Sequence, residues 1–197
     1  MSCRNLTVFL KWVCALFIGI GLTQGNANAS ELSDLLKKSD HVLLMRHALA
    51  PGVGDPAGYT LQECKTQRNL DSKGREQAHR IGQWLNAQGV KEAMVFSSAW
   101  CRCKETAENL AFGTPVPEAS LNSFLDNKRQ GPQSNLNLQI FIANQLKTKG
   151  DKALVLVTHQ VNITEFTGET IGSGDMVLAK VNAAGKMISF KTYPSPS

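Results

Sequence analysis

Three short apolar runs constrain the fold of this chain more than any other feature of its sequence. They are His41–Met45, Met94–Ser97 and Ala153–Val157, each bounded by polar or turn-forming residues. Apolar runs of this length are typical of strands buried on both faces, and such strands occur in parallel sheets that helices cover. The three runs therefore predict an α/β fold.

Helical patterns alternate with these runs along the chain. Apolar residues recur at helical spacing, and Ser, Asp or Gly residues stand where helix caps are favoured. We expect helices over residues 30–38, 71–88, 101–112, 135–148 and 161–168. Strands that alternate with helices form a parallel or mixed sheet with helices on both faces, and ligands bind beyond the carboxyl ends of the strands.

Further segments complete the predicted layout. Residues 48–69 form a long polar loop rich in Gly and Pro, and loops of this length are usually functional. Residues 116–130 are irregular, with a short strand expected near Ser120 and Leu121, and residues 173–181 and 187–193 form a closing pair of strands. The apolar face expected for the helix over 135–148 consists of Leu136, Ile140 and Ala143, widened by Phe141, Ile142 and Leu146.

The first thirty residues have the pattern of a secretory signal peptide. Arg4 and Lys11 are the only charged residues before Ser30, and Trp12–Leu22 is an uncharged, mostly apolar run. Such a run is too short to span a bilayer and suits the core of a signal peptide. Ala27-Asn28-Ala29 then provides a small-x-small cleavage site. The alternative interpretation is an uncleaved membrane anchor.

Cleavage after Ala29 divides the chain into a signal peptide, residues 1–29, and one domain, residues 30–197, that is periplasmic or secreted and has no stable membrane span. Such a compartment is oxidising, so a disulfide is plausible. The domain keeps three cysteines, and we expect Cys64 to pair with either Cys101 or Cys103.

Five basic side chains follow or flank the predicted strands. Arg46 and His47 end the first strand, Arg102 follows the second, His159 follows the third, and Arg68 ends the long loop. Burying these cationic groups together without an anion is costly, and guanidinium groups bind phosphate oxygens in bidentate fashion. The sequence therefore predicts a phosphate site at this edge of the sheet.

These residues belong to a set of four motifs in chain order. The motifs are Leu44-Met45-Arg46-His47, then Arg68-Asn69-Leu70 through Gly74-Arg75-Glu76-Gln77-Ala78, then Ser97-Ser98 with Arg102 and Thr106-Ala107, then Val157-Thr158-His159. Over about residues 40–180 the chain resembles the histidine phosphatase superfamily, also called the phosphoglycerate mutase-like family. The resemblance implies a three-layer α/β/α sandwich with a mostly parallel central sheet.

The resemblance also implies roles for the five basic residues. His47 is the expected nucleophile, which requires a neutral imidazole whose other nitrogen is held by a backbone carbonyl. Arg46, Arg102 and a protonated His159 are expected to stabilise the charge of the transferred phosphoryl group, with Arg68 as a fourth donor. Fixed cations of this kind need no metal ion or other cofactor, and none is expected.

Two positions depart from the family pattern, and no residue is the obvious general acid. Ala48 and Gln160 stand where the family usually has Gly, and both keep a backbone N–H for substrate binding. Asp126 is the best placed candidate for the general acid, and the alternative is that it caps a turn.

The expected activity is that of an exported phosphomonoesterase. The substrate is a small phosphorylated compound, with a sugar phosphate or a lipopolysaccharide core phosphate as candidates. The alternatives are a mutase of the same fold and a phosphate-binding domain without turnover.

The net charge fits this interpretation. The chain has a formal charge of +5, and cleavage removes two basic residues and no acidic one, which leaves +3. Because three arginines are already assigned to one anion pocket, the basic balance indicates a local phosphate site and no nucleic-acid partner.

Overall fold

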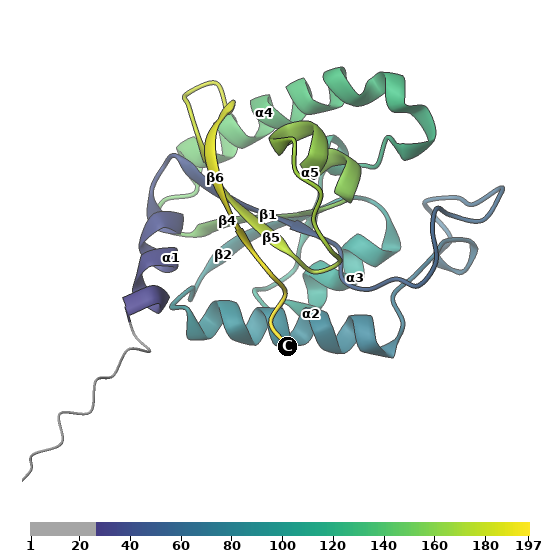
Figure 1. Cartoon of the computed structure of the whole chain (residues 1–197), viewed down its shortest axis with the longest axis horizontal. Helices are drawn as coiled ribbons and strands as arrows, with labels where there is room; N and C mark the ends of the chain where they lie inside the picture. The colour runs from purple at the N-terminus through teal and green to yellow at the C-terminus, as the bar shows by residue number, and fades with distance from the viewer. Residues whose placement is uncertain (1–26) are drawn as a thin grey trace, which may run out of the picture.

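A six-stranded sheet forms the centre of the computed structural model, which describes residues 27–197 (Figure 1). Arg4, Lys11 and the apolar run Trp12–Leu22, on which the predicted signal peptide rests, lie outside the described residues. The strands run in the order β3-β2-β4-β1-β5-β6 across the sheet. Their bounds are β1 His41–Arg46, β2 Ala93–Ser97, β3 Val116–Pro117, β4 Ala153–Thr158, β5 Met176–Val181 and β6 Met187–Tyr193.

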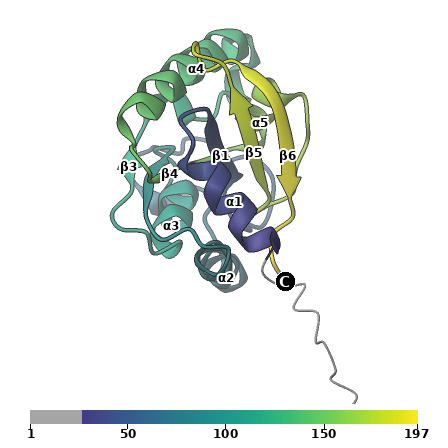
Figure 2. The same cartoon turned by 90° about the vertical axis from the view of Figure 1, so that its left-hand side faces the viewer.

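Helices cover both faces of this sheet in the described part of the chain. Their bounds are α1 Ala27–Lys37, α2 Ser72–Ala87, α3 Cys101–Asn109, α4 Gly131–Thr148 and α5 Gln160–Thr167. Leu43 and Met45 of β1 pack in one apolar cluster with residues of α1, α2 and α3, whereas Val42 and Leu44 pack in another with residues of α4 and α5. Because alternate side chains of a strand point to opposite faces, the fold has the predicted three layers (Figures 1 and 2).

The central strands are parallel, as the apolar runs predict. β4 pairs in parallel with both β1 and β2, while β5 and β6 complete one side of the sheet in antiparallel pairing. In register, Arg46 lies beside Thr158, and Ser97 lies beside Val157. The carboxyl ends of β1, β2 and β4 therefore meet at one edge of the sheet, and the chain continues from each of them into the loops that carry the basic residues.

α2 begins where its sequence predicts and supports the loop above this edge. Asp71 caps it, because the Asp71 side chain accepts a hydrogen bond of 2.7 Å from the Gly74 N–H. A Cβ atom at Gly74 would lie 2.0 Å from the Leu49 carbonyl oxygen. Glycine at this position thus lets the backbone just after His47 pass close over the first turn of α2.

The region between α3 and α4 differs from the expectation. The expected strand near Ser120 is wrong: residues Ala119–Leu121 form a 3₁₀ helix, which Glu118 caps by accepting the Ser120 N–H. The strand there is the short β3 instead. α4 begins at Gly131 rather than Asn135, because Pro132 is compatible with the first turn of a helix.

The apolar face expected for α4 is wrong in part. Ile142 and Leu146 are buried as expected, and Leu138 is buried with them against the sheet. Leu136 and Ile140 are instead exposed by 48% and 51%. Apolar residues are scattered around this helix, so the side that docks on the sheet and α5 decides which of them are buried.

A disulfide links the long loop to α3. Cys64, in a 3₁₀ turn at Cys64–Thr66, is bonded to Cys101, the first residue of α3, and Cys103 remains a buried free thiol. Of the two pairings that the sequence left open, the structure has Cys64–Cys101. Among residues 27–197, no helix combines the length and apolar character needed to cross a bilayer.

We expect loss of the disulfide to destabilise the fold. The bond closes a segment of 37 residues, and a closure of this size contributes about 2–4 kcal/mol to the free energy of unfolding. Thermal unfolding with and without reductant measures this contribution in the wild type and in the Cys64→Ser/Cys101→Ser double variant. A Cys103→Ala control should keep the response to reductant, and a wild type indifferent to reductant would contradict the expectation.

Two leucines of α4 test which face is buried. Leu138→Ala should lower the free energy of unfolding by about 2–5 kcal/mol, because it leaves a cavity in the core. Leu136→Ala removes the same atoms from an exposed position and should change it by less than about 0.5 kcal/mol. Urea unfolding of the two variants gives both values, and equal losses would contradict the observed face.

Candidate active site

A cavity of about 260 Å³ opens at the carboxyl ends of β1 and β4. Its lining residues come from four separate segments of the chain: Arg46, His47, Gly52, Val53, Gly54, Arg68, Arg102, Ser123, Leu125, His159, Gln160 and Val161. The structure thus brings together all five basic residues that the sequence placed at this edge. A larger hollow of about 560 Å³ borders α2, but one histidine and no arginine line it.

His47 is held in the orientation that a nucleophile needs. Its ring lies at the end of β1, buried to 2% exposure, and its backbone N–H donates to the Thr158 carbonyl over 2.9 Å. The Nδ1 atom lies 2.8 Å from the carbonyl oxygen of Ala48. A carbonyl can only accept, so Nδ1 carries the proton and Nε2 keeps its lone pair.

The surroundings of His47 also favour its neutral form. Burial lowers the pKa of His47 to about 3, and the charges of Arg102, Arg68 and Arg46 act in the same direction, against the smaller opposite effect of the Ala48 carbonyl. The imidazole is therefore uncharged at neutral pH, with a lone pair available on Nε2.

His159 is anchored through its other nitrogen. Its Nε2 lies 2.8 Å from the Ser98 hydroxyl, which donates to Asn122 Oδ1 and accepts the Trp100 N–H. Nε2 is thus the donor toward Ser98, and Nδ1, which lies 3.5 Å from Arg102 Nη2, keeps its lone pair.

The protonated form expected for His159 is not the form of the anion-free site. Burial holds the pKa of His159 well below its usual range, and His47 and the three arginines lower it further. A proton on Nδ1 therefore has to arrive with an anion, whose negative charge favours the imidazolium.

Two arginines have donors that no group within residues 27–197 uses. Arg46 donates through Nη1 to the Ile171 carbonyl over 2.8 Å, while its Nε is buried without a partner. The Nε of Arg102 is likewise buried without a partner, on a side chain that is only 3% exposed. An unpaired N–H in the interior is unfavourable, and both arginines line the cavity, so their guanidinium groups supply positive charge and free donors close to it.

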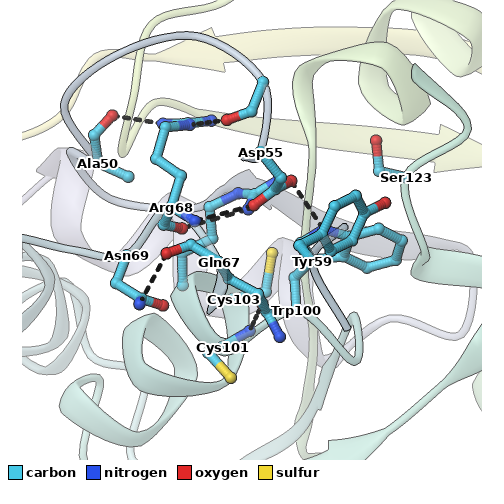
Figure 3. A network of polar contacts seen from close by, with 12 residues as sticks. Ala50, Asp55, Tyr59, Gln67, Arg68, Asn69, Trp100, Cys101, Cys103 and Ser123 are labelled. Carbon is cyan, nitrogen blue, oxygen red and sulfur yellow. Dashed lines mark hydrogen bonds and ion pairs between the residues drawn. The ribbon is translucent and has the colours of Figure 1, made fainter. Parts of the chain in front are cut away.

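Arg68 has a second role besides lining the cavity. Its Nε donates to the Gly54 carbonyl over 2.8 Å, and its Nη1 donates to the Ala50 carbonyl (Figure 3). The side chain therefore holds the tip of the long loop around Val53 while presenting its charge to the cavity.

Ala48 and Gln160 differ in what they offer a ligand. The Ala48 N–H donates to Thr106 Oγ1 over 3.0 Å, and its carbonyl accepts from His47. Its backbone is therefore engaged in orienting His47, which differs from the expected role in substrate binding. Gln160, the first residue of α5, lines the cavity as expected.

Asp126 is not brought to the cavity. Its side chain is exposed, and its Oδ2 accepts a hydrogen bond of 2.9 Å from the Tyr59 hydroxyl. Burial and this carboxylate raise the pKa of Tyr59 to about 12, so the phenol keeps its proton. The acid role of Asp126 stays a prediction that its position does not support.

The sequence did not single out Asp55, which pairs with Arg102 from the long loop. Asp55 Oδ1 lies 2.9 Å from Arg102 Nη1, and the two side chains are 6% and 3% exposed. Asp55 stands in a Gly- and Pro-rich segment without periodicity, so no pattern marked it. Ser98 and Thr106 do fall in the quoted motifs, and that was the available signal for their roles.

Comparisons with known proteins agree with this geometry. A sequence profile of the histidine phosphatase superfamily (branch 1) matches residues 42–124. No curated protein matches the chain at a significant level.

Similar solved structures cover most of the chain at low sequence identity. A mycobacterial glucosyl-3-phosphoglycerate phosphatase in complex with VO3 has a TM-score of 0.56 at 13% identity, over 80% of this chain and 100% of that chain. The protein histidine phosphatase SixA with tungstate has a TM-score of 0.54 at 18% identity, over 79% and 97%. Phosphoserine phosphatase from Entamoeba histolytica, with 3-phosphoglyceric acid, has a TM-score of 0.52 at 13% identity, over 76% and 95%.

These neighbours share the fold, and the matched profile spans β1, the long loop, α2, β2 and α3 with the three motifs that contain Arg46, Arg68 and Arg102. Over residues 42–124 the chain is similar to the histidine phosphatase superfamily (branch 1).

Proposed function

We propose that this protein is a phosphatase that hydrolyses a small phosphate monoester through a phosphohistidine on His47. The observation that carries the proposal is the pairing of His47 Nδ1 with the Ala48 carbonyl, which leaves a neutral Nε2 in a cavity lined by three arginines. The match of residues 42–124 to the superfamily profile supports phosphoryl transfer of the phosphatase or mutase kind.

The reaction proceeds in two displacements at phosphorus. His47 Nε2 attacks, the P–O bond to the leaving group breaks with its electron pair, and the leaving oxygen takes up a proton. Water then attacks the phosphohistidine, the P–N bond breaks, the water loses a proton, and phosphate departs with His47 restored as a neutral imidazole.

The cationic groups stabilise the transferred phosphoryl group. Its transition state spreads negative charge over three equatorial oxygens. The unpartnered Nε atoms of Arg46 and Arg102 are fixed donors for those oxygens, and Arg68 adds charge from the loop side. His159, once protonated on Nδ1 by the arriving anion, is a further donor.

Export and substrate identity extend the proposal. A signal peptide over residues 1–29 and a periplasmic or secreted location are supported by the Cys64–Cys101 disulfide, which suits an oxidising compartment. Candidate substrates are a sugar phosphate or lipopolysaccharide core phosphate, and the small esters named for two of the structural neighbours, which are phosphoserine and glucosyl-3-phosphoglycerate.

Replacing the nucleophile tests the proposal directly. His47→Asn should lower kcat/KM for p-nitrophenyl phosphate by at least about 1,000-fold, because the amide of Asn has no nucleophilic nitrogen with which to form the covalent intermediate. Rapid quenching of the wild type should yield protein phosphorylated on His47, detected by mass spectrometry.

His79→Asn is the matched control, since His79 is an exposed histidine of α2 that contacts Gln83. Turnover by His47→Asn at the rate of the control would contradict the role of His47. Phosphate binding without hydrolysis across a broad panel of esters would favour the binding-domain alternative, and transfer to an acceptor alcohol without net phosphate release would favour the mutase.

The pH dependence should reflect the low pKa values of both histidines. His47 stays neutral down to about pH 3, so its protonation does not limit the reaction in weak acid. A phosphate ester loses its second proton near pH 6, so below that pH it carries the proton that His159 Nδ1 takes up. We therefore expect kcat/KM for aryl phosphates to rise as the pH falls from about 7.5 to 5.5. A decrease over this interval with a midpoint near 6.5 would contradict the assignment.

A further inference from the structure

Asp55 is the most completely hydrogen-bonded carboxylate near the cavity. It accepts from Arg102 Nη1 over 2.9 Å and Nη2 over 3.1 Å, from Trp100 Nε1 over 3.0 Å and from the Arg68 N–H over 2.9 Å (Figure 3). It does not line the cavity itself, whereas Arg102 does. Asp55 therefore lies behind Arg102, on the side away from a bound phosphoryl group.

The carboxylate of Asp55 is ionised in this network. Burial alone would raise the pKa of Asp55, but the hydrogen bonds from Arg102 and Arg68 and the charge of Arg102 outweigh burial and lower it. An ionised, fully hydrogen-bonded carboxylate has no proton to give a leaving group. Its contribution is a fixed negative charge and a fixed pair of acceptor atoms.

The pair of acceptor atoms determines how Arg102 is turned. A guanidinium group has an end edge, formed by its two Nη atoms, and a side edge, formed by Nε and one Nη. Asp55 occupies the end edge with both oxygens. On the side edge of Arg102, the Nε atom is buried without a partner among the described residues. The Nη2 atom, which also belongs to this edge, lies 3.5 Å from His159 Nδ1.

We propose that Asp55 is a positioning residue: by holding the end edge of Arg102, it turns the side edge toward the phosphoryl group beside His159. This inference rests on the proposed function. Without Asp55, Arg102 is free to present its terminal nitrogens in several orientations, and the donors must be ordered anew in each catalytic cycle. With Asp55 in place, the donors are fixed before the substrate arrives.

The same contact links the site to the conformation of the long loop. Asp55 belongs to the loop, and Trp100 and Arg102 flank the half-cystine Cys101, whose partner Cys64 lies in that loop. In addition, the backbone carbonyls of Ala50 and Gly54 in the loop accept hydrogen bonds from the Arg68 side chain. The position of Arg102 therefore depends on the contacts between this loop and the start of α3.

A double-mutant cycle tests the proposal with p-nitrophenyl phosphate. Asp55→Asn keeps the size of the side chain and removes its charge, and we expect it to lower kcat/KM by about 10- to 100-fold in the otherwise unchanged protein. In an Arg102→Ala background the same substitution should change kcat/KM by less than about 3-fold, because the residue through which Asp55 acts is gone. Glu63→Gln is the control, since Glu63 is an exposed carboxylate of the same loop, 3.5 Å from Lys65.

Thermal unfolding separates positioning from a merely structural role. In the Arg102→Ala background the buried carboxylate loses its ion-pair partner and keeps only the hydrogen bonds from Trp100 and Arg68, so adding Asp55→Asn should raise Tm and change kcat/KM by less than about 3-fold. A similar loss of kcat/KM in both backgrounds, or a loss below about 3-fold in the otherwise unchanged protein, would overturn the proposal. If Asp55→Asn does not fold, Asp55→Glu carries the same cycle, because it keeps the charge and shifts the acceptor atoms.

Binding of inorganic phosphate, measured by calorimetry, distinguishes failure of this inference from failure of the proposed function. If the wild type hydrolyses no ester, the proposed function fails, and the cycle is scored on phosphate affinity instead. Weaker binding caused by Asp55→Asn only where Arg102 is present supports positioning. Equal effects in both backgrounds overturn it.

Discussion

The structure depends on how it accommodates positive charge at the ends of its parallel strands. Three arginines and two histidines converge where β1, β2 and β4 end, and the charges of the arginines lower the pKa values of both histidines. The chain responds in two ways. Both histidines are kept neutral by burial, and one arginine is paired with the buried carboxylate of Asp55. An anion in the cavity would interact with the positive charge that remains on the other arginines.

The parts of the fold and site that follow from strands were accessible to sequence reasoning. A strand buried on both faces leaves a continuous apolar run, so His41–Met45 and Ala153–Val157 located the sheet. The residues directly after such runs necessarily lie at its carboxyl edge, which placed His47 and His159 together. These inferences needed only chain connectivity and the periodicity of a strand.

Features that depend on tertiary docking were not accessible in the same way. Asp55 finds Arg102 because a long loop folds back over the start of α3, and no local pattern encodes that return. The buried face of α4 depends on how the helix is rotated on the sheet, since Leu136 and Leu138 are equally apolar in the sequence. Asp126 was favoured for its position in the chain, but Tyr59 holds it outside the cavity.

The turn at Gly52-Val53-Gly54 has a consequence for how this site can diversify. Val53 is 98% exposed at the mouth of the cavity, between two glycines with positive φ, while the backbone on either side is held by Arg68 at Ala50 and Gly54. Among the residues that line the cavity, Val53 is thus one that the rest of the protein constrains little. Selectivity can evolve at this single tip while the arginines and histidines beneath it stay unchanged.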